Sequence, residues 1–193
     1  MGRERACSLP PFFRHMILKS SIMDEAAVRR SLTRITHEII EKNSGTNDLC
    51  LLGIRRRGVS LANVLAENLQ RFEGVQVPVG SIDISLYRDD LSELGDLPET
   101  GSTEIPFEIT GKRLIIVDDV IYTGRTARAA IDAIFHYGRP KQIQLAVLID
   151  RGHRELPIRP DYVGKNIPTS HTEVVCVLVD EFDGRTGVDL MQL

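Results

Sequence analysis

The chain has 193 residues with a net charge of -3 at neutral pH, and 42% of its residues are hydrophobic. This length and composition are typical of one globular domain with a full hydrophobic core. The weakly acidic balance argues against a surface that coats nucleic acid throughout, but it permits a local basic patch.

The composition also argues against a membrane-spanning protein, because no apolar run approaches the roughly 20 residues that cross a bilayer. Residues 1–20 lack the continuous apolar stretch of a secretory signal, so we expect an irregular extension before a domain at 21–193. Cys50 and Cys176 lie in apolar runs, as buried reduced thiols do, which predicts a cytoplasmic protein.

The first half of the chain alternates helix and strand patterns. Asp24 is a suitable N-cap for a first helix, and residues 49–54 are apolar, as in a buried strand. Leucines at helical spacing predict a second helix over about 59–72. The alternation in 77–87 predicts another strand, and the aperiodic stretch from 88 to about 104 has the length of a functional lid.

The second half continues this alternation. Residues 114–117 predict a buried strand that ends at the carboxylate pair Asp118-Asp119, and a short turn then opens a helix over about 126–137. Residues 143–149 and 172–179 predict two more strands. Together these elements indicate an α/β fold with a mainly parallel sheet, in which ligands bind at the carboxyl ends of the strands.

The turn after the carboxylate pair has the composition of a phosphate site. Its sequence Tyr122-Thr123-Gly124-Arg125-Thr126 offers backbone N–H groups, hydroxyls and the positive end of a helix dipole. Carboxylates beside a phosphate would repel it unless they bind another group, and ribose hydroxyls donate well to carboxylate oxygens. The pattern therefore indicates a sugar phosphate, with helix capping by the carboxylates as the alternative.

A second loop, Arg55-Arg56-Arg57-Gly58, follows the strand at 49–54. Glycine after three arginines favours a tight turn whose amides approach an anion, and a solvated basic turn is the alternative. The sequence contains no dinucleotide-binding glycine motif, P-loop, serine nucleophile elbow or zinc-binding His/Cys cluster. A covalent nucleophile is not indicated.

Four stretches resemble known proteins. Residues 117–126 resemble the signature of type I phosphoribosyltransferases, and residues 82–91, 148–159 and 161–169 resemble one family. That family is the bifunctional pyrimidine operon attenuation regulators and uracil phosphoribosyltransferases of bacteria. The resemblance implies the type I phosphoribosyltransferase fold, a mainly parallel sheet flanked by helices, with a small hood and a mobile lid loop.

The resemblance implies conversion of uracil and phosphoribosyl diphosphate to UMP and diphosphate. Mg²⁺ would be bound mainly through the substrate, with no metal ligand assigned directly. The catalytic pair Asp118 and Asp119 would hold the ribose hydroxyls and face the positive charge of the transition state. Residues implied to bind phosphoribosyl diphosphate are Arg56, Arg57, Gly58, Arg88, Tyr122, Thr123, Gly124, Arg125 and Thr126. Residues implied to bind the base are Arg151, Tyr162 and Val163, with simple packing as the alternative for Tyr162.

Arg56 departs from the family pattern. Many relatives have a small hydroxyl residue at this point of the diphosphate loop. A bulky cation there either tightens diphosphate binding or fills part of the empty site.

The family also binds a stem-loop of pyrimidine-operon leader mRNA, more tightly with UMP, and acts as a homodimer or higher homo-oligomer. The residues matched to its RNA-binding face are Thr33, Arg34, His37, His153, Arg154, Arg159 and Lys165. Such side chains would contact phosphates and unstacked bases, and a solvated helix face is the alternative. Two other functions stay open: an RNA-binding regulator with residual catalysis, or a purine-base phosphoribosyltransferase, which residues 160–164 also resemble.

Overall fold

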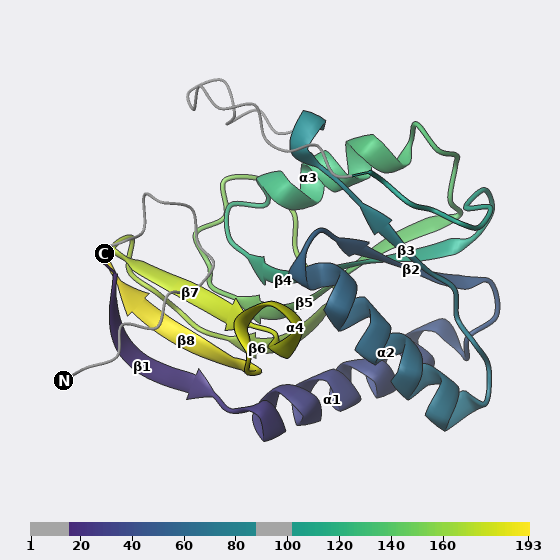
Figure 1. The fold of residues 1–193 in the computed structure, drawn as a ribbon. Coiled ribbons are helices and arrows are strands. Elements are labelled where there is room, and N and C mark those ends of the chain that lie inside the picture. The colour runs from purple at the N-terminus through teal and green to yellow at the C-terminus, as the bar shows by residue number, and fades with distance from the viewer. Residues whose placement is uncertain (1–15, 88–101) are drawn as a thin grey trace.

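The computed structural model describes residues 16–87 and 102–193 (Figure 1). Residues 1–15 of the expected extension, Arg88 and most of the expected lid therefore lie outside the described residues. No helix within the described ranges is long and apolar enough to cross a membrane. The elements, in chain order, are β1 Ile17–Met23, α1 Glu25–Asn43, β2 Leu49–Ile54, α2 Arg57–Glu73, β3 Val79–Ile82, the 3-10 helix η2 Ser85–Tyr87, β4 Arg113–Ile121, α3 Arg125–Ile134, β5 Gln142–Asp150, β6 Tyr162–Asn166, β7 Glu173–Leu178, α4 Asp180–Asp183 and β8 Gly187–Gln192.

The strands form two sheets. The main sheet has five parallel strands in the order β3-β2-β4-β5-β6, which confirms the predicted α/β fold. The smaller sheet, in the order β1-β8-β7, is antiparallel and takes the place of the expected hood. Its strand β1 begins at Ile17 and pairs with β8. Residues 17–20 therefore belong to a strand, and the expectation that they are irregular is wrong.

Different helices bury the two faces of the main sheet (Figure 1). Residues of α1 and α2 pack with Ile115 and Val117 of β4, whereas α3 packs with Leu114 and Ile116. This alternation follows from the strand geometry, since successive side chains point to opposite faces. Side chains further along β4 therefore alternate between the α2 side and the α3 side.

The predicted strand over 77–87 is shorter than expected. β3 ends at Ile82, because the Asp83 carboxylate accepts hydrogen bonds from the backbone N and the hydroxyl of Ser85, at 2.8 and 2.5 Å. This local bonding turns the backbone away from the sheet. On the outer edge of β3, Ser81 and Glu104 exchange two backbone hydrogen bonds, of 2.8 and 2.9 Å.

Candidate functional site

Strand β4 carries the carboxylate pair further into the sheet than the sequence predicted. The strand continues to Ile121, since Asp118 pairs with Val147 of β5 and Ile121 with Asp150. The two carboxylates therefore lie within the strand rather than after its end. Because neighbouring strand residues point to opposite faces, Asp118 faces the α3 side and Asp119 faces the α2 side, near Arg57.

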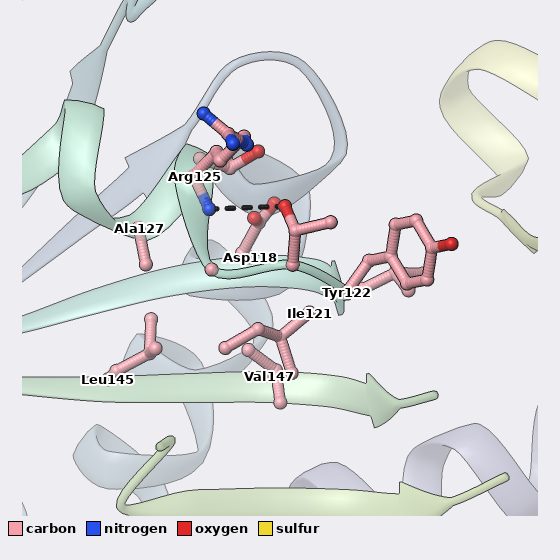
Figure 2. A pocket seen from close by; sticks show the side chains of 11 residues that line it. Asp118, Ile121, Tyr122, Arg125, Ala127, Leu145 and Val147 are labelled. Atoms are coloured by element: carbon pink, nitrogen blue, oxygen red, sulfur yellow. Dashed lines mark hydrogen bonds between the residues drawn. The ribbon is translucent and has the colours of Figure 1, made fainter. Parts of the chain in front are cut away.

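A pocket of about 350 Å³ lies between the start of α3 and strands β4 and β5 (Figure 2). Asp118 lines it, together with the whole predicted phosphate turn from Tyr122 to Thr126. The apolar side of the pocket comes from Ile121, Ala127, Leu145 and Val147. The structure thus brings one carboxylate and the predicted turn into a single cavity of the size that small-molecule ligands use.

The turn itself requires a glycine. Gly124 has φ of 95° and is the N-cap of α3, a left-handed conformation that other residues adopt only with strain. The first N–H groups of a helix have no intrahelical acceptor and carry the positive end of its dipole. At the mouth of this cavity these groups are well placed to receive an anion, which stays a prediction.

The segment after β5 holds the turn from behind. The backbone N–H groups of Glu155 and Leu156 donate to the carbonyl of Thr123, at 3.0 and 3.1 Å. The Glu155 carboxylate accepts from Nε of Arg125 at 2.9 Å, and Arg154 donates to the carbonyl of Tyr122 at 2.8 Å. These bonds fix the backbone of the turn.

The environment of Asp119 disfavours its charged form. Desolvation by burial raises the pKa of this carboxyl, while a hydrogen bond from the backbone N of Val120 and the charge of Arg57 lower it. The raised pKa follows from the removal of water around the group. A cationic substrate centre near Asp119 would restore the charged carboxylate.

The arginine loop after β2 behaves differently from the phosphate turn. Arg57 begins α2, and its Nη2 donates to the carboxylate of Asp183 in α4 at 2.9 Å, with Asp183 buried. Gly58 is needed for packing, because a Cβ there would lie 2.4 Å from the carbonyl oxygen of Val117. Arg56 is exposed and lines a second, larger pocket of about 760 Å³ with Arg55 and Phe182. Among the predicted diphosphate residues of the arginine loop, all of which the structure describes, Arg56 alone lines this second pocket.

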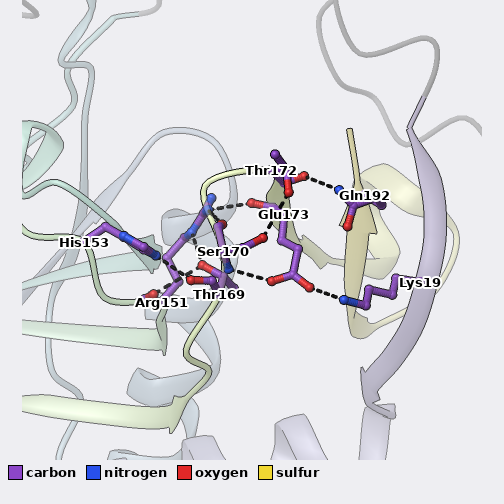
Figure 3. Close-up of polar contacts among 8 residues, drawn as sticks. All are labelled: Lys19, Arg151, His153, Thr169, Ser170, Thr172, Glu173 and Gln192. Atoms are coloured by element: carbon purple, nitrogen blue, oxygen red, sulfur yellow. Dashed lines mark hydrogen bonds and ion pairs between the residues drawn. The ribbon is translucent and has the colours of Figure 1, made fainter.

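Arg151 bonds to the loop that leads into the hood (Figure 3) and also contacts Tyr122 of the turn. Its Nε donates to the hydroxyl of Thr169 at 3.1 Å, and its Nη2 donates to the carbonyl of Glu173 at 2.5 Å. The guanidinium carbon lies 4.1 Å from the centroid of the Tyr122 ring, within cation–π distance. Burial lowers the pKa of this guanidinium. The residue therefore positions Tyr122, a role that sequence reasoning did not foresee.

A carboxylate supports this connection from the hood side. Glu173 accepts from Nζ of Lys19 in β1 at 2.5 Å and from the backbone N of Ser170 at 2.6 Å (Figure 3). These hydrogen bonds, that of Lys19 first, lower the pKa of the Glu173 carboxyl to about 2. The carboxylate thereby ties β1 to the loop that holds Arg151.

Two of the predicted RNA-binding residues are engaged inside the protein. Arg154 donates to the carbonyls of Ile158 and Tyr122 and to the carboxylate of Asp150, at 3.0, 2.8 and 2.5 Å. His153 donates from Nε2 to the carbonyl of Thr169 at 2.6 Å. Both side chains are half-buried and bonded within the protein, and their contact with RNA stays a prediction.

The other residues matched to the RNA-binding face are more accessible. Arg34, His37, Arg159 and Lys165 are exposed, and Thr33 is half-buried. Arg34 pairs with Glu38, and its Nη2 donates to the carbonyls of Val163 and Gly164 at 2.9 and 2.6 Å. The guanidinium thus spans from α1 to the edge strand β6.

The prediction that Tyr162 stacks on the base is wrong. The Tyr162 side chain is 2% exposed, packs in the core, and bonds through its hydroxyl with Asn43 and Gln144, both at 3.0 Å. Burial raises its pKa to about 12. Its neighbour Val163 is half-buried and pairs with Val147, which lines the pocket. Because side chains alternate along a strand, Tyr162 and Val163 point to opposite faces of the sheet.

Sequence reasoning missed the residues that support the site. Glu155 and Leu156 carry backbone donors, and Asp183 lies in a short acidic helix, so their composition resembles that of any surface segment. Their roles depend on contacts between distant parts of the chain. Within the described ranges, no group of three or more His, Cys, Asp or Glu side chains is arranged to hold a metal ion.

Comparison with known families places this geometry. Residues 20–181 match the family described as phosphoribosyl transferase domain. A curated relative from Acetivibrio thermocellus, called bifunctional protein PyrR, is 63% identical over 178 residues, which cover 92% of this chain and 97% of the relative. A relative of the same name from Thermus thermophilus is 56% identical over 177 residues, covering 92% and 98% of the two chains.

Solved structures share the fold. The hypoxanthine phosphoribosyltransferase of Trypanosoma cruzi has a TM-score of 0.72 at 22% identity and covers 91% of this chain and 96% of its own. A hypoxanthine-guanine phosphoribosyltransferase from Bacillus anthracis has a TM-score of 0.66 at 18% identity, covering 93% and 100%. At this level of identity the likeness shows the architecture alone.

Proposed function

Since the chain belongs to the phosphoribosyl transferase domain family and, within it, to the bifunctional PyrR proteins, we propose that it joins two functions. It transfers the phosphoribosyl group of phosphoribosyl diphosphate to uracil, and it regulates pyrimidine-operon transcription by binding leader RNA. Both functions belong in the cytoplasm, where the transcript and both substrates are available.

The pocket at the carboxyl end of β4 carries the enzymatic half of the proposal. The turn from Tyr122 to Thr126 and the start of α3 bind the 5′-phosphate through backbone N–H groups and hydroxyls. Asp118, in the same cavity, accepts hydrogen bonds from the ribose hydroxyls. One pocket thus offers both a site for the phosphate and a carboxylate for the ribose hydroxyls of a ribose 5-phosphate.

The carboxylates also suit the reaction. The bond from ribose C1 to the diphosphate oxygen breaks while a bond to N1 of uracil forms, and positive charge develops on the sugar. The proton of uracil N1 is released to solvent. Asp118 provides negative charge in the cavity, which stabilises the positive charge on the sugar more than the neutral sugar of the ground state, and Asp119 takes up its charged form as the positive charge develops. The leaving diphosphate is bound by Arg56, which faces open solvent at the start of α2.

The base contacts are assigned to Arg151 and to the backbone of Val163. Among the described residues the Nη1 group of Arg151 makes no hydrogen bond, so it can donate to a uracil carbonyl oxygen. Val163 lies level with Val147 and Asp118 across the sheet. This alignment supports a base site that adjoins the ribose site.

Magnesium fits this donor set as a partner of the substrate. Mg²⁺ prefers oxygen ligands and is usually held by one or two carboxylates together with substrate phosphates. Asp118 is the carboxylate of the pair that lines this cavity, and the diphosphate would supply the remaining oxygens. The ion would neutralise the charge of the leaving diphosphate.

A steady-state assay with uracil, phosphoribosyl diphosphate and Mg²⁺ tests the enzymatic half. We expect UMP to form, and hypoxanthine and guanine to compete poorly with uracil. UMP formation at background level in the native chain would refute the proposal. Preferential use of a purine base would instead establish the purine-base alternative.

A gel-shift titration of the leader stem-loop RNA, with and without UMP, tests the regulatory half. The exposed side chains of Arg34, His37, Arg159 and Lys165 provide the RNA-contacting groups. We expect tighter binding with UMP and weaker binding for Lys165→Ala. RNA binding without measurable catalysis would favour the regulator with residual activity, and sedimentation of the same samples gives the expected dimer or higher homo-oligomer.

A further inference from the structure

Helices α1 and α2 bring three planar side chains together on the protein surface. The rings of His37 and Phe72 stack with their centroids 4.5 Å apart and an angle of 23° between their planes. The guanidinium carbon of Arg71 lies 4.7 Å from the centroid of the Phe72 ring. These residues form the Arg71–Phe72–His37 stack, of which only His37 was matched to the RNA-binding face.

The stack is accessible and is not needed for the core. Arg71 and His37 are exposed, and Phe72 is half-buried. None of the three belongs to either hydrophobic core cluster. The three planar groups are therefore held together at the surface, where a further planar group can stack on them.

The stack is continuous with the other exposed residues of α1. Helix α1 packs against α2 on one side and against β6 on the other. Arg34 reaches the carbonyls of β6, while His37, one turn further, reaches Phe72 of α2. Arg34, His37 and the stack therefore lie along one surface.

The charge of this surface is mixed. Arg34 is paired with Glu38, and the carboxylates of Glu41, Glu67 and Glu73 are exposed on the same two helices. Arg71 makes no ion pair within the described ranges and is held by its contact with the Phe72 ring. Such a surface attracts phosphates only weakly, so it must recognise its partner through planar contact rather than through charge alone.

We propose that the Arg71–Phe72–His37 stack is a platform for an unpaired base of the leader stem-loop, an inference that rests on the proposed RNA-binding function. Unpaired RNA bases stack on aromatic rings and on arginine guanidinium planes, because every base has an accessible π-face. The platform explains why a surface of mixed charge binds RNA, and it adds Arg71 and Phe72 to the residues that contact it. Binding here depends on a single-stranded loop.

Fluorescence anisotropy with a labelled leader stem-loop tests the proposal. The variant Phe72→Leu keeps an apolar side chain that favours helix but removes the ring. The variant Phe72→Tyr keeps an aromatic ring at this position. We expect Phe72→Leu to weaken binding by about tenfold, from the usual strength of one base–aromatic stack, and Phe72→Tyr to bind as the native chain does. Phe135→Leu, the same change at an exposed ring beyond α3 on the opposite face of the sheet, serves as the matched control.

A second RNA and a second assay separate the outcomes. The same stem without unpaired bases should bind the native chain and Phe72→Leu equally, and UMP synthesis should be equal in all variants. Equal binding of the intact stem-loop by the native chain and Phe72→Leu would overturn the proposal and leave the regulatory function standing. Failure of the native chain to bind any leader RNA would refute both the proposed RNA-binding function and the base platform. A change in the sedimenting mass of Phe72→Leu would assign the stack to contact between copies of the chain and would also overturn the proposal.

Discussion

The two loops at the carboxyl edge of β4 and β5 have similar compositions and opposite uses. The loop after β4, residues 122–126, lines a cavity with its polar groups. The loop after β5 begins with Arg151 and Arg154, whose guanidinium groups bond to carbonyls of the protein itself. The first loop lines a cavity, and the second holds the first in place.

This difference teaches that a conspicuous run of charged residues identifies a site without saying which of its members touch the ligand. Arg154 bonds to the carbonyl of Tyr122, so a change at Arg154 reaches the phosphate turn through one residue. Considered by its charge alone, Arg154 would be assigned to an exposed basic surface. The hydrogen-bond partners of each residue decide between the two roles.

The largest effect is expected for Asp118→Asn, in strand β4, where the carboxylate lines the same cavity as the first loop. The change removes the negative charge in the pocket, so kcat/KM for UMP synthesis should fall by about a hundredfold or more. The urea midpoint should change little, because the carboxylate lines a cavity. Asp132→Asn, on the exposed surface of α3, is the control and should keep full activity. An Asp118→Asn enzyme of native activity would refute the assignment of this pocket.

The sharpest test of the difference between the two loops is Arg154→Ala, in the loop after β5 that holds residues 122–126 in place. Loss of the bonds to Tyr122, Ile158 and Asp150 should lower the free energy of unfolding by about 2 kcal/mol. The KM for phosphoribosyl diphosphate should rise, since the phosphate turn loses a support. Urea unfolding and steady-state kinetics measure the two effects. Reduced RNA binding with native stability and native KM would return Arg154 to the RNA surface and break the comparison.

A smaller effect is expected for Tyr162→Phe. The hydroxyl loses its bonds to Asn43 and Gln144, but these two amides keep bonding to each other at 3.1 and 3.2 Å. The free energy of unfolding should therefore fall by only about 1 kcal/mol, with an unchanged KM for uracil. A raised KM for uracil would show that Tyr162 reaches the base after all.

The same tyrosine predicts a loss of stability in alkali. Its pKa is raised to about 12 by burial, whereas an exposed tyrosine ionises near pH 10. The stability that neutral Tyr162 contributes to the folded state should be fully present below pH 10 and be lost as the pH rises towards 12. Tyr162→Phe should show a shallower decline of the urea midpoint over this range than the native chain.

The smallest effect is expected for Glu173→Gln in acid. The pKa of Glu173 is lowered to about 2 by its bonds to Lys19 and Ser170, so its carboxylate stabilises the native state above pH 4.5. That contribution is lost as the pH falls from about 4.5 through about 2, since protonation breaks the interaction. Glu173→Gln should lack this part of the acid unfolding curve, followed by circular dichroism. Identical acid curves would show that the carboxylate is not charged preferentially in the fold.

Some parts of this structure could be predicted from the sequence because they depend on local chemistry. The N-cap of α1 was predicted at Asp24, whose carboxylate accepts from the backbone N of Ala27 at 2.7 Å, and β2 has the predicted bounds 49–54. The phosphate turn was predicted because a helix start, a glycine and hydroxyl residues lie together in the chain. The α/β fold followed from the alternation of apolar runs with helical spacing.

Other parts could not be predicted because they depend on contacts between distant residues. β6 has the sequence Tyr-Val-Gly-Lys-Asn, which lacks the apolar run of a buried strand, and the burial of Tyr162 depends on Asn43 in α1. Gly58 was taken for an anion-binding residue, although it serves close contact with Val117. The pairing of β1 with β8 joins the two ends of the described chain, where no local pattern predicts it.

The two-bond bridge between Ser81 and Glu104 has a consequence for the behaviour of the protein at high concentration. β3 is the outermost strand of the main sheet, and an uncovered outermost strand can recruit a strand of another molecule. Because Glu104 already takes the N–H and the carbonyl of Ser81, the chain covers this strand with its own backbone. Assembly through continuous intermolecular sheets is thereby disfavoured at β3, which protects the protein from fibril formation on that side.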